Sequence, residues 1–182
     1  KKLDMWDFNK NNEELAHKSG KFFKIKGISV ETNFGNKKKW EQPIIDQPEI
    51  GILGILTKVI NGVRYFLMQA KMEPGNVNIL QLSPTVQATK SNFSQVHKGK
   101  LPSYLEYFTL ANKSKFLYDQ LQTEQGGRFF KKRNRNVVIE VNDDIDLLPG
   151  FCWLTLAEIK KLLTFDNFVN MDARSVISII PL

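Results

Sequence analysis

A polar stretch at residues 71–92 holds side chains that could bind and act on a hydroxyl-rich ligand. It has little apolar periodicity and follows a strongly apolar segment. Its hydrogen-bonding side chains are Lys71, Glu73, Asn76, Gln81, Ser83, Thr85, Gln87, Thr89, Lys90, Ser91 and Asn92. Connections between elements are usually short and built from turn residues. We therefore expect a long loop that lines a binding site, and the alternative is a solvated connection.

Residues 128–135, RFFKKRNR, concentrate basic charge: they contain five basic residues and no acidic one, in a chain of net charge +7. The residues that follow, 137–141, alternate as one buried face of a strand. Extending this alternation backwards places Arg133 and Arg135 on the same inward face. Two guanidiniums there would suit a phosphate or diphosphate. The pattern leaves open a solvent-exposed strand end or a bulge that reverses the parity.

The elements that must position these residues begin with a hairpin. Residues 51–60 and 63–71 flank Asn61-Gly62, the dipeptide favoured by tight type I′ turns. These two segments are predicted to pair as antiparallel strands. The polar stretch would then begin where the second strand ends.

Helices are expected in the second half of the chain. Residues 104–110 are ambiguous between strand and helix, although Ser103 and Glu106 would form a capping box. Residues 113–124 are predicted as a helix that buries its leucines and ends before two glycines.

Two further helices complete the expected architecture. Thr155 and Glu158 form a capping box ahead of one helix, and another starts near Asp172. Strands that precede and separate helices without strict alternation indicate an α+β fold. Residues 1–40, rich in Lys and Asn, look like an appended N-terminal segment, and 41–182 form the main module.

Composition excludes several classes of protein. The 182 residues, 42% hydrophobic and 25% charged, fit a folded globular domain. The apolar runs are too short to cross a bilayer and no leader pattern appears, so we expect no membrane partner. One cysteine, Cys152, fits a reducing, cytoplasmic compartment. His17 and His97 lie far apart without metal-ligand spacing, so no metal site is expected. Basic residues confined to one octapeptide disfavour nucleic acid as a partner.

Eight motifs closely resemble those of the NDP-hexose 2,3-dehydratases, in that family's order. They are WEQPI at 40–44, KMEPGN at 71–76, QLSPTVQATKSN at 81–92, VHKG at 96–99, YLEYF at 104–108, QTEQGG at 122–127, KKRNRN at 131–136 and VNMDAR at 169–174. The resemblance implies a Nudix-hydrolase-like fold, an α/β/α sandwich around a mixed β-sheet. The acidic helix motif of Nudix hydrolases is absent after residues 63–71. Mg²⁺-assisted diphosphate cleavage is therefore not expected.

The family acts on dTDP-4-keto-6-deoxyglucose in deoxysugar biosynthesis, and the resemblance implies the same substrate here. The C4 ketone acidifies the hydrogen on C3, so a base can form an enolate that expels the C2 hydroxyl. This chemistry needs a base near C3, a donor for the oxyanion at O4 and an acid for the departing hydroxide. No cofactor is expected, because no redox step occurs and no dinucleotide or P-loop glycine pattern appears.

The resemblance also implies partners. Family members typically carry two Nudix-like modules in tandem, so we expect a homodimer to reproduce that arrangement. A 3-ketoreductase that consumes the unstable diketone product is the expected functional partner. The alternative interpretation is a nucleotide-sugar-binding module without chemistry.

Candidate catalytic residues are Glu73, His97, Tyr104 and Glu124. His97 can act as base or acid near neutral pH, and Glu73 lies where a turn could present it. Glu124 would oppose a helix dipole, which is unfavourable for stability alone. Tyr104 could donate to O4. The alternatives are a loop histidine, a carboxylate that fixes its own turn and a core tyrosine.

Candidate binding residues follow from chemical type. Lys132, Arg133 and Arg135 are assigned to the diphosphate, and Lys71 to a phosphate or the ketone. Trp40 either stacks on thymine or anchors the N-terminal segment. The remaining candidates are Asn76, Gln81, Ser83, Thr85, Gln87, Lys90, Ser91, Asn92, Gln125, Asn134, Asn170, Asp172 and Arg174. The resemblance raises Asn134, Asn136 and Asn170 as members of a hydrogen-bond network. Asp172 and Arg174 could equally cap and charge-balance the last helix.

Overall fold

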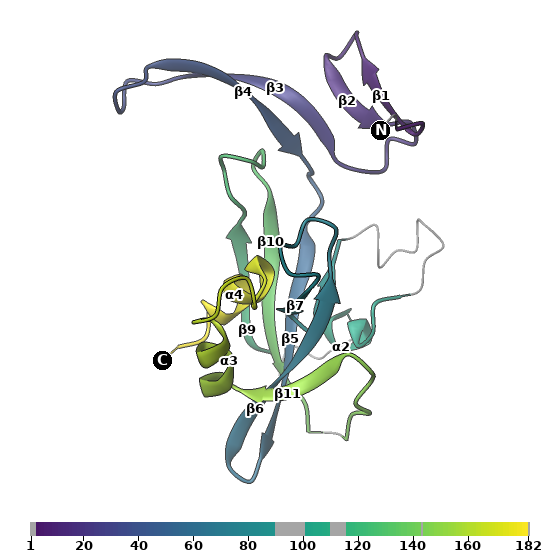
Figure 1. Ribbon diagram of the computed structural model, residues 1–182, viewed down its shortest axis with the longest axis vertical. Coiled ribbons are helices and arrows are strands. Elements are labelled where there is room, and N and C mark those ends of the chain that lie inside the picture. The colour runs from purple at the N-terminus through teal and green to yellow at the C-terminus, as the bar shows by residue number, and fades with distance from the viewer. Residues whose placement is uncertain (1–2, 90–100, 110–115, 143, 182) are drawn as a thin grey trace. The chain divides into compact units, whose positions relative to one another are not determined.

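A computed structural model describes residues 3–89, 101–109, 116–142 and 144–181. The chain divides into two compact units (Figure 1). The first unit consists of Lys1–Ile50 and Thr123–Arg133, and the second of Gly51–Gln122 and Asn134–Leu182. Within the described ranges, no helix is long and apolar enough to span a bilayer.

The first unit contains a four-stranded antiparallel sheet in the order β1-β2-β3-β4. Its strands are β1 (Trp6–Asn9), β2 (Glu14–His17), β3 (Lys24–Glu31) and β4 (Lys39–Asp46). β3 and β4 pair along their whole length, from Lys24 opposite Asp46 to Glu31 opposite Lys39. The domain boundary expected after residue 40 therefore falls inside β4, and the compact unit continues to Ile50.

The second unit is built on a mixed sheet in the order β11-β6-β5-β10-β9, with β7 added to β6 and β8 added to β5. The strands are β5 (Gly51–Ile60), β6 (Val63–Met72), β7 (Leu80–Ser83), β8 (Val86–Ala88), β9 (Phe116–Thr123), β10 (Arg133–Glu140) and β11 (Phe151–Thr155). β5 and β10 are parallel, whereas β6 pairs with β5, β7 and β11 in antiparallel fashion.

Helices cover both faces of this sheet (Figure 1). They are α2 (Leu105–Thr109), α3 (Leu156–Leu162) and α4 (Met171–Ile177). Leu56 and Val137 share a core cluster with Phe108 of α2. The alternate residues Ile55 and Val138 share the opposite cluster with α3 and α4. Because side chains alternate along a strand, the two clusters lie on opposite faces, and the expected α/β/α sandwich is confirmed.

Local predictions based on turn and cap chemistry are confirmed. Asn61 and Gly62 have φ of 50° and 79°, as a type I′ turn requires, and they join β5 to β6. Thr155 and Glu158 form the expected capping box of α3. α4 begins at Met171, one residue before the expected start.

The predicted helix at 113–124 is wrong, because Phe116–Thr123 forms strand β9 at the edge of the sheet. Leu117 and Leu121, which the helix would have buried, are 37% and 48% exposed. An edge strand with one solvent-exposed side carries apolar residues at spacings that also fit a helix. Pairing with β10 decides in favour of the strand.

The ambiguous segment at 104–110 is a short helix. Tyr104 has φ of 62°, and the helix starts after it at Leu105. The predicted capping box required Ser103 to be the residue directly before the helix. That position is held by Tyr104, so the capping-box prediction is wrong.

The prediction of one long loop at 71–92 is also wrong. β6 extends to Met72, and the strands β7 and β8 occupy much of the stretch. Leu82, Val86 and Ala88 are buried, so the stretch contributes to the core as well as to polar contacts. These strands are three or four residues long, too short for a clear period in the sequence.

Candidate active site

Four polar side chains form a continuous chain of contacts in the second unit. Lys71 Nζ lies 3.7 Å from Glu73 Oε1, and Gln87 Nε2 donates a hydrogen bond of 2.9 Å to the same oxygen. Asn170 Nδ2 donates to Gln87 Oε1 at 3.3 Å. We call Lys71, Glu73, Gln87 and Asn170 the Glu73 network. It joins a cation, a carboxylate and two amides.

Two strands, one turn and the start of one helix position this network. Lys71 lies near the end of β6, opposite Gln81 of β7. Glu73 follows β6 in a turn that the Asn76 N–H closes by donating to the Glu73 carbonyl at 3.1 Å. Gln87 lies in the middle of β8, and Asn170 is the N-cap of α4. The turn expected to present Glu73 is therefore observed.

The surroundings of Lys71 favour proton exchange. Its side chain is only 27% exposed, and this burial lowers the pKa of Lys71 despite the opposing charges of Glu73 and Asp172. Burial disfavours the charged form of a lysine, so Lys71 gives up a proton more readily than a lysine in water. A carboxylate beside such a lysine is an arrangement suited to acid–base catalysis.

Buried amides extend the polar region along the sheet. Asn136 of β10 and Gln87 of β8 both pair with Leu53, so the three residues form one row across the sheet. Asn134 Oδ1 accepts a hydrogen bond from the Gly51 N–H at 3.1 Å. An added Cβ on Gly51 would lie 2.9 Å from that oxygen, so the contact requires glycine. Within the described residues, Asn136 Oδ1 and Asn76 Nδ2 are buried without a hydrogen-bond partner.

Three candidates have hydroxyl groups that already serve the fold. The Tyr104 hydroxyl donates to the Asp146 carbonyl at 2.7 Å and accepts from the Leu148 N–H at 2.9 Å. Thr85 Oγ1 donates to the Leu67 carbonyl, and the Ser83 hydroxyl donates to the Pro84 carbonyl. All three side chains are buried, which favours the core interpretation of Tyr104.

The prediction that Arg133 and Arg135 both face inward is wrong for Arg133, which is exposed. Arg135 is half-buried and binds both carboxylate oxygens of Asp119, at 2.7 and 2.6 Å. This hydrogen bonding raises the pKa of Arg135, and its guanidinium also lies over the Phe116 ring. Asp119 and Phe116 belong to β9, the strand that the sequence predicted as a helix. The partner of Arg135 was therefore not foreseeable.

Several candidates lie in the first unit. Lys132 is buried and its Nζ donates to the Glu49 carbonyl. Trp40 Nε1 donates to Gln42 Oε1 at 2.8 Å, which supports the anchoring interpretation. Glu124 and Lys132 line a shallow hollow together with the Phe129 and Phe130 rings.

The remaining candidates fall into three groups. Some are exposed, some belong to α4, and some lie outside the described residues. Gln125 is exposed, and its carbonyl accepts from the Arg128 and Phe129 N–H groups. Arg174 is exposed and its Nε donates to the Asn170 carbonyl at 3.4 Å, while Asp172 lies in the first turn of α4. Four candidates lie outside the described residues, namely Lys90, Ser91, Asn92 and His97.

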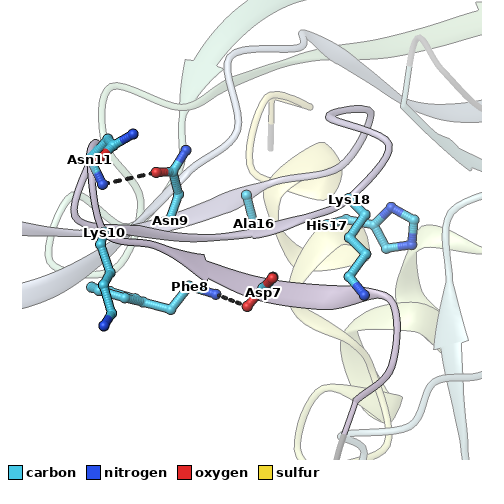
Figure 2. A pocket seen from close by; sticks show the side chains of 8 residues that line it. All are labelled: Asp7, Phe8, Asn9, Lys10, Asn11, Ala16, His17 and Lys18. Carbon is cyan, nitrogen blue, oxygen red and sulfur yellow. Dashed lines mark hydrogen bonds between the residues drawn. The ribbon is translucent and has the colours of Figure 1, made fainter.

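Figure 2 shows a hollow on the β1–β2 hairpin that contains none of the predicted site residues. It is lined by Asp7, Phe8, Asn9, Lys10, Asn11, Ala16, His17 and Lys18. Two of these polar side chains cap their own turns: Asp7 accepts from the Phe8 N–H and Asn9 from the Asn11 N–H, each at 2.9 Å. These contacts serve the hairpin, so we assign no ligand to this hollow. In the described part of the chain, no group of three or more His, Cys, Asp or Glu side chains could hold a metal ion.

Comparison with known proteins decides the family. Residues 1–180 match the family described as NDP-hexose 2,3-dehydratase.

The chain belongs to this family.

Three relatives bear the name dTDP-4-dehydro-6-deoxy-alpha-D-glucopyranose 2,3-dehydratase. The relative from Saccharopolyspora spinosa is 55% identical over 99% of this chain. Those from Amycolatopsis orientalis and Streptomyces violaceoruber are 49% and 46% identical, each over 98% of this chain. The chain spans only 37%, 39% and 41% of the respective relatives' lengths. The 2,3-dehydratase match also begins at residue 1, so it includes the segment that the motifs left out.

A solved structure supports the fold. The crystal structure of an ADP compounds hydrolase matches with a TM-score of 0.51 at 14% identity, covering 98% of this chain and 93% of that one. At this identity the likeness concerns the fold alone. The Nudix-hydrolase-like architecture expected for a 2,3-dehydratase family member is therefore confirmed, and hydrolysis is not transferred.

Proposed function

We propose that this chain contributes the reacting centre of a dTDP-4-dehydro-6-deoxyglucose 2,3-dehydratase, a hydro-lyase. The observation that carries the proposal is the identity of 46% to 55% with relatives of that name over nearly the whole chain. The Glu73 network supplies the chemistry, because it places a carboxylate beside a partly buried lysine.

The reaction assigns one task to each charged member of the network. The Glu73 carboxylate takes the proton from C3, and the electron pair of that bond moves toward O4. The Lys71 ammonium stabilises the resulting enolate oxygen. The enolate then re-forms the ketone as the C2–O bond breaks, and the departing hydroxide takes the proton from Glu73. Water leaves, the carboxylate is restored, and the enol product tautomerises to a 3,4-diketo-2,6-dideoxy sugar.

Exchange and elimination in D₂O test this proposal. The protein is incubated with the 4-keto nucleotide sugar, and deuterium at C3 and loss of water are followed by mass spectrometry. Glu73→Gln is expected to lower both rates by about 10²–10⁴-fold, as for the loss of a general base. Glu106→Gln is the matched control, because Glu106 is exposed on α2. Equal rates for Glu73→Gln and the wild type would remove Glu73 from the mechanism.

A binding module without chemistry is the competing outcome of the same experiment. It predicts that the protein binds dTDP by calorimetry and catalyses neither exchange nor elimination. Exchange without elimination would instead indicate a competent base that lacks its acid.

The proposal includes a setting for the enzyme. We place it in the cytoplasm as a homodimer, with a 3-ketoreductase consuming its unstable diketone. The tandem modules implied by the resemblance support the dimer, and the reactivity of a vicinal diketone supports the reductase. A light-scattering mass of one chain at working concentration would contradict the dimer.

The other assigned roles stay predictions. Asn76, Gln81 and Asn134 are candidate binding residues, and the exposed Arg133 is assigned to the diphosphate. Each is tested by alanine substitution with dTDP affinity and the exchange rate measured separately.

A further inference from the structure

We infer that Asn170 is a positioning residue that acts through Gln87 to hold the Glu73 carboxylate in its reactive orientation. The inference rests on the proposed function, since it concerns the base of that reaction. It gives the N-cap of α4 a second task beyond starting a helix. Asn170 lies 83 residues from Gln87 in the sequence, so local pattern does not reveal the link.

The orientation of the Asn170 amide is set by the backbone. Its side-chain oxygen accepts a hydrogen bond of 2.8 Å from the Ala173 N–H, which can only donate. Only the oxygen of an amide can accept from a backbone N–H, so the nitrogen of the same amide points the other way. The Asn170 Nδ2 group must therefore face Gln87. Asn170 is 4% exposed, so water competes little for this group.

The orientation of Gln87 follows from that of Asn170. Gln87 Oε1 accepts from Asn170 Nδ2, which turns Gln87 Nε2 toward Glu73. An ionised carboxylate can only accept, so the far end of the relay also has a single allowed direction. A reversed Gln87 amide would set oxygen against oxygen at Glu73 and NH₂ against NH₂ at Asn170. The relay therefore has one consistent arrangement, running from a backbone donor to a carboxylate.

The charged neighbours do not replace this relay. Lys71 approaches Glu73 Oε1 only to 3.7 Å, beyond normal hydrogen-bond distance, whereas the Gln87 contact is 2.9 Å. Asp172 interacts electrostatically with Lys71, and Arg174 donates to the Asn170 backbone carbonyl rather than to its side chain. Of these two contacts, the one between the Gln87 amide and Glu73 has the length of a directed hydrogen bond.

Asn170→Ser separates the two tasks of this residue. Serine is as good an N-cap as asparagine, so the unfolding midpoint should stay within about 2 °C of the wild type. Its side chain is too short to reach Gln87, so the relay is lost. We expect the C3 exchange rate at saturating substrate to fall about 10-fold to 100-fold, the range for a misplaced reacting group. The dissociation constant for dTDP should change by less than about twofold, because the residues assigned to the diphosphate, Lys132, Arg133 and Arg135, are unchanged.

A double-variant comparison identifies the route. In a Gln87→Leu background, adding Asn170→Ser should cause no further loss, because both substitutions break the same relay. Asn142→Ser, on an exposed asparagine, is the matched control and should leave the rate unchanged. An unchanged rate in Asn170→Ser, or an equal fall in both backgrounds, would overturn the inference.

Side-chain amide resonances give a readout that does not need turnover. The Gln87 NH₂ signals should shift in Glu73→Gln and shift similarly in Asn170→Ser. If the Gln87 NH₂ signals do not shift in Asn170→Ser, the relay is overturned, even where the C3 exchange rate falls. A wild-type protein with these shifts but no exchange or elimination would instead sink the proposed function alone.

Discussion

Tyr104 illustrates how a residue type suited to catalysis can be engaged in structural contacts. It has φ of 62°, a strained value for a bulky residue, and its hydroxyl bridges the backbone at Asp146 and Leu148. A hydroxyl with its only hydrogen already donated cannot also donate to a ketone. The side chain therefore fixes the segment before α2 against the segment before β11.

Tyr104→Phe should destabilise the protein without slowing the reaction. The Leu148 N–H and the Asp146 carbonyl would each lose a partner, which should lower the unfolding free energy by about 1–3 kcal/mol. Urea denaturation measures this loss. Tyr65→Phe, on a half-buried tyrosine of β6, is the control and should change stability less. A fall in C3 exchange beyond about tenfold in Tyr104→Phe would restore its catalytic assignment.

At the scale of elements, α3 depends on its first turn. The Thr155 hydroxyl accepts from the Glu158 N–H at 3.2 Å, and Glu158 Oε2 accepts from the Thr155 N–H at 2.7 Å. These hydrogen bonds from Thr155 lower the pKa of Glu158 below 4.5. A depressed carboxyl pKa means that the folded state binds its proton less readily than the unfolded state.

Glu158→Gln should remove a pH-dependent part of the stability. The contribution of the Glu158 charge is present above pH 4.5 and is lost as the pH falls through the lowered folded pKa. We therefore expect the variant to unfold at a lower temperature than the wild type at pH 7, with a difference that shrinks as the pH falls below 4.5. Thermal unfolding by circular dichroism checks this. A difference in unfolding temperature that grows as the pH is lowered would contradict the assigned role of the Glu158 charge.

The contact between β5 and α2 leaves no room for a side chain at Gly54. A Cβ there would lie 2.2 Å from Phe108 Cε1, and Phe108 is only 2% exposed. Gly54→Ala should lower the unfolding free energy by about 1–3 kcal/mol, as overpacking does in well-filled cores. Gly75→Ala is the control, since nothing lies within 4 Å of its Cβ position.

Combining Gly54→Ala with Phe108→Leu tests that the ring is the obstacle. The smaller side chain should recover part of the loss, so the double variant should be more stable than the sum of the single effects predicts. Strict additivity in urea denaturation would argue against the contact.

At the scale of the whole molecule, the first unit is assembled from two separate parts of the chain. Ile45 exchanges backbone hydrogen bonds of 2.8 Å with Arg128 and Phe130, and the Glu49 carbonyl accepts from Lys132. Residues 123–133 therefore depend on the N-terminal strands for their order. Within the basic octapeptide, Arg128, Phe130 and Lys132 make structural contacts, whereas Arg133 is exposed to solvent.

Removing residues 1–50 should affect the two units differently. We expect amide hydrogen exchange to rise in residues 124–133, whose backbone partners are lost, and to stay slow in residues 136–141, where the core residues of β10 lie. Exchange followed by mass spectrometry measures both segments. Loss of protection in 136–141 as well would contradict independent folding of the second unit.

Much of the fold was predictable from neighbouring residues. The Asn61-Gly62 turn, the Thr155 capping box and the start of α4 each depend on side chains within a few positions, so local chemistry decides them. β9 was not predictable, since its pairing with β10 overrides a pattern that also fits a helix.

The sequence by itself determined the family and the sandwich architecture, and it predicted a binding site in the polar stretch that contains Glu73 and Gln87. Only the tertiary structure decided which of these side chains meet. Asn170 reaches Gln87 across 83 residues, and Arg135 finds its carboxylate on a neighbouring strand. The physical reason is that a buried polar group needs a partner in space, and residue type alone does not specify where the fold will place it.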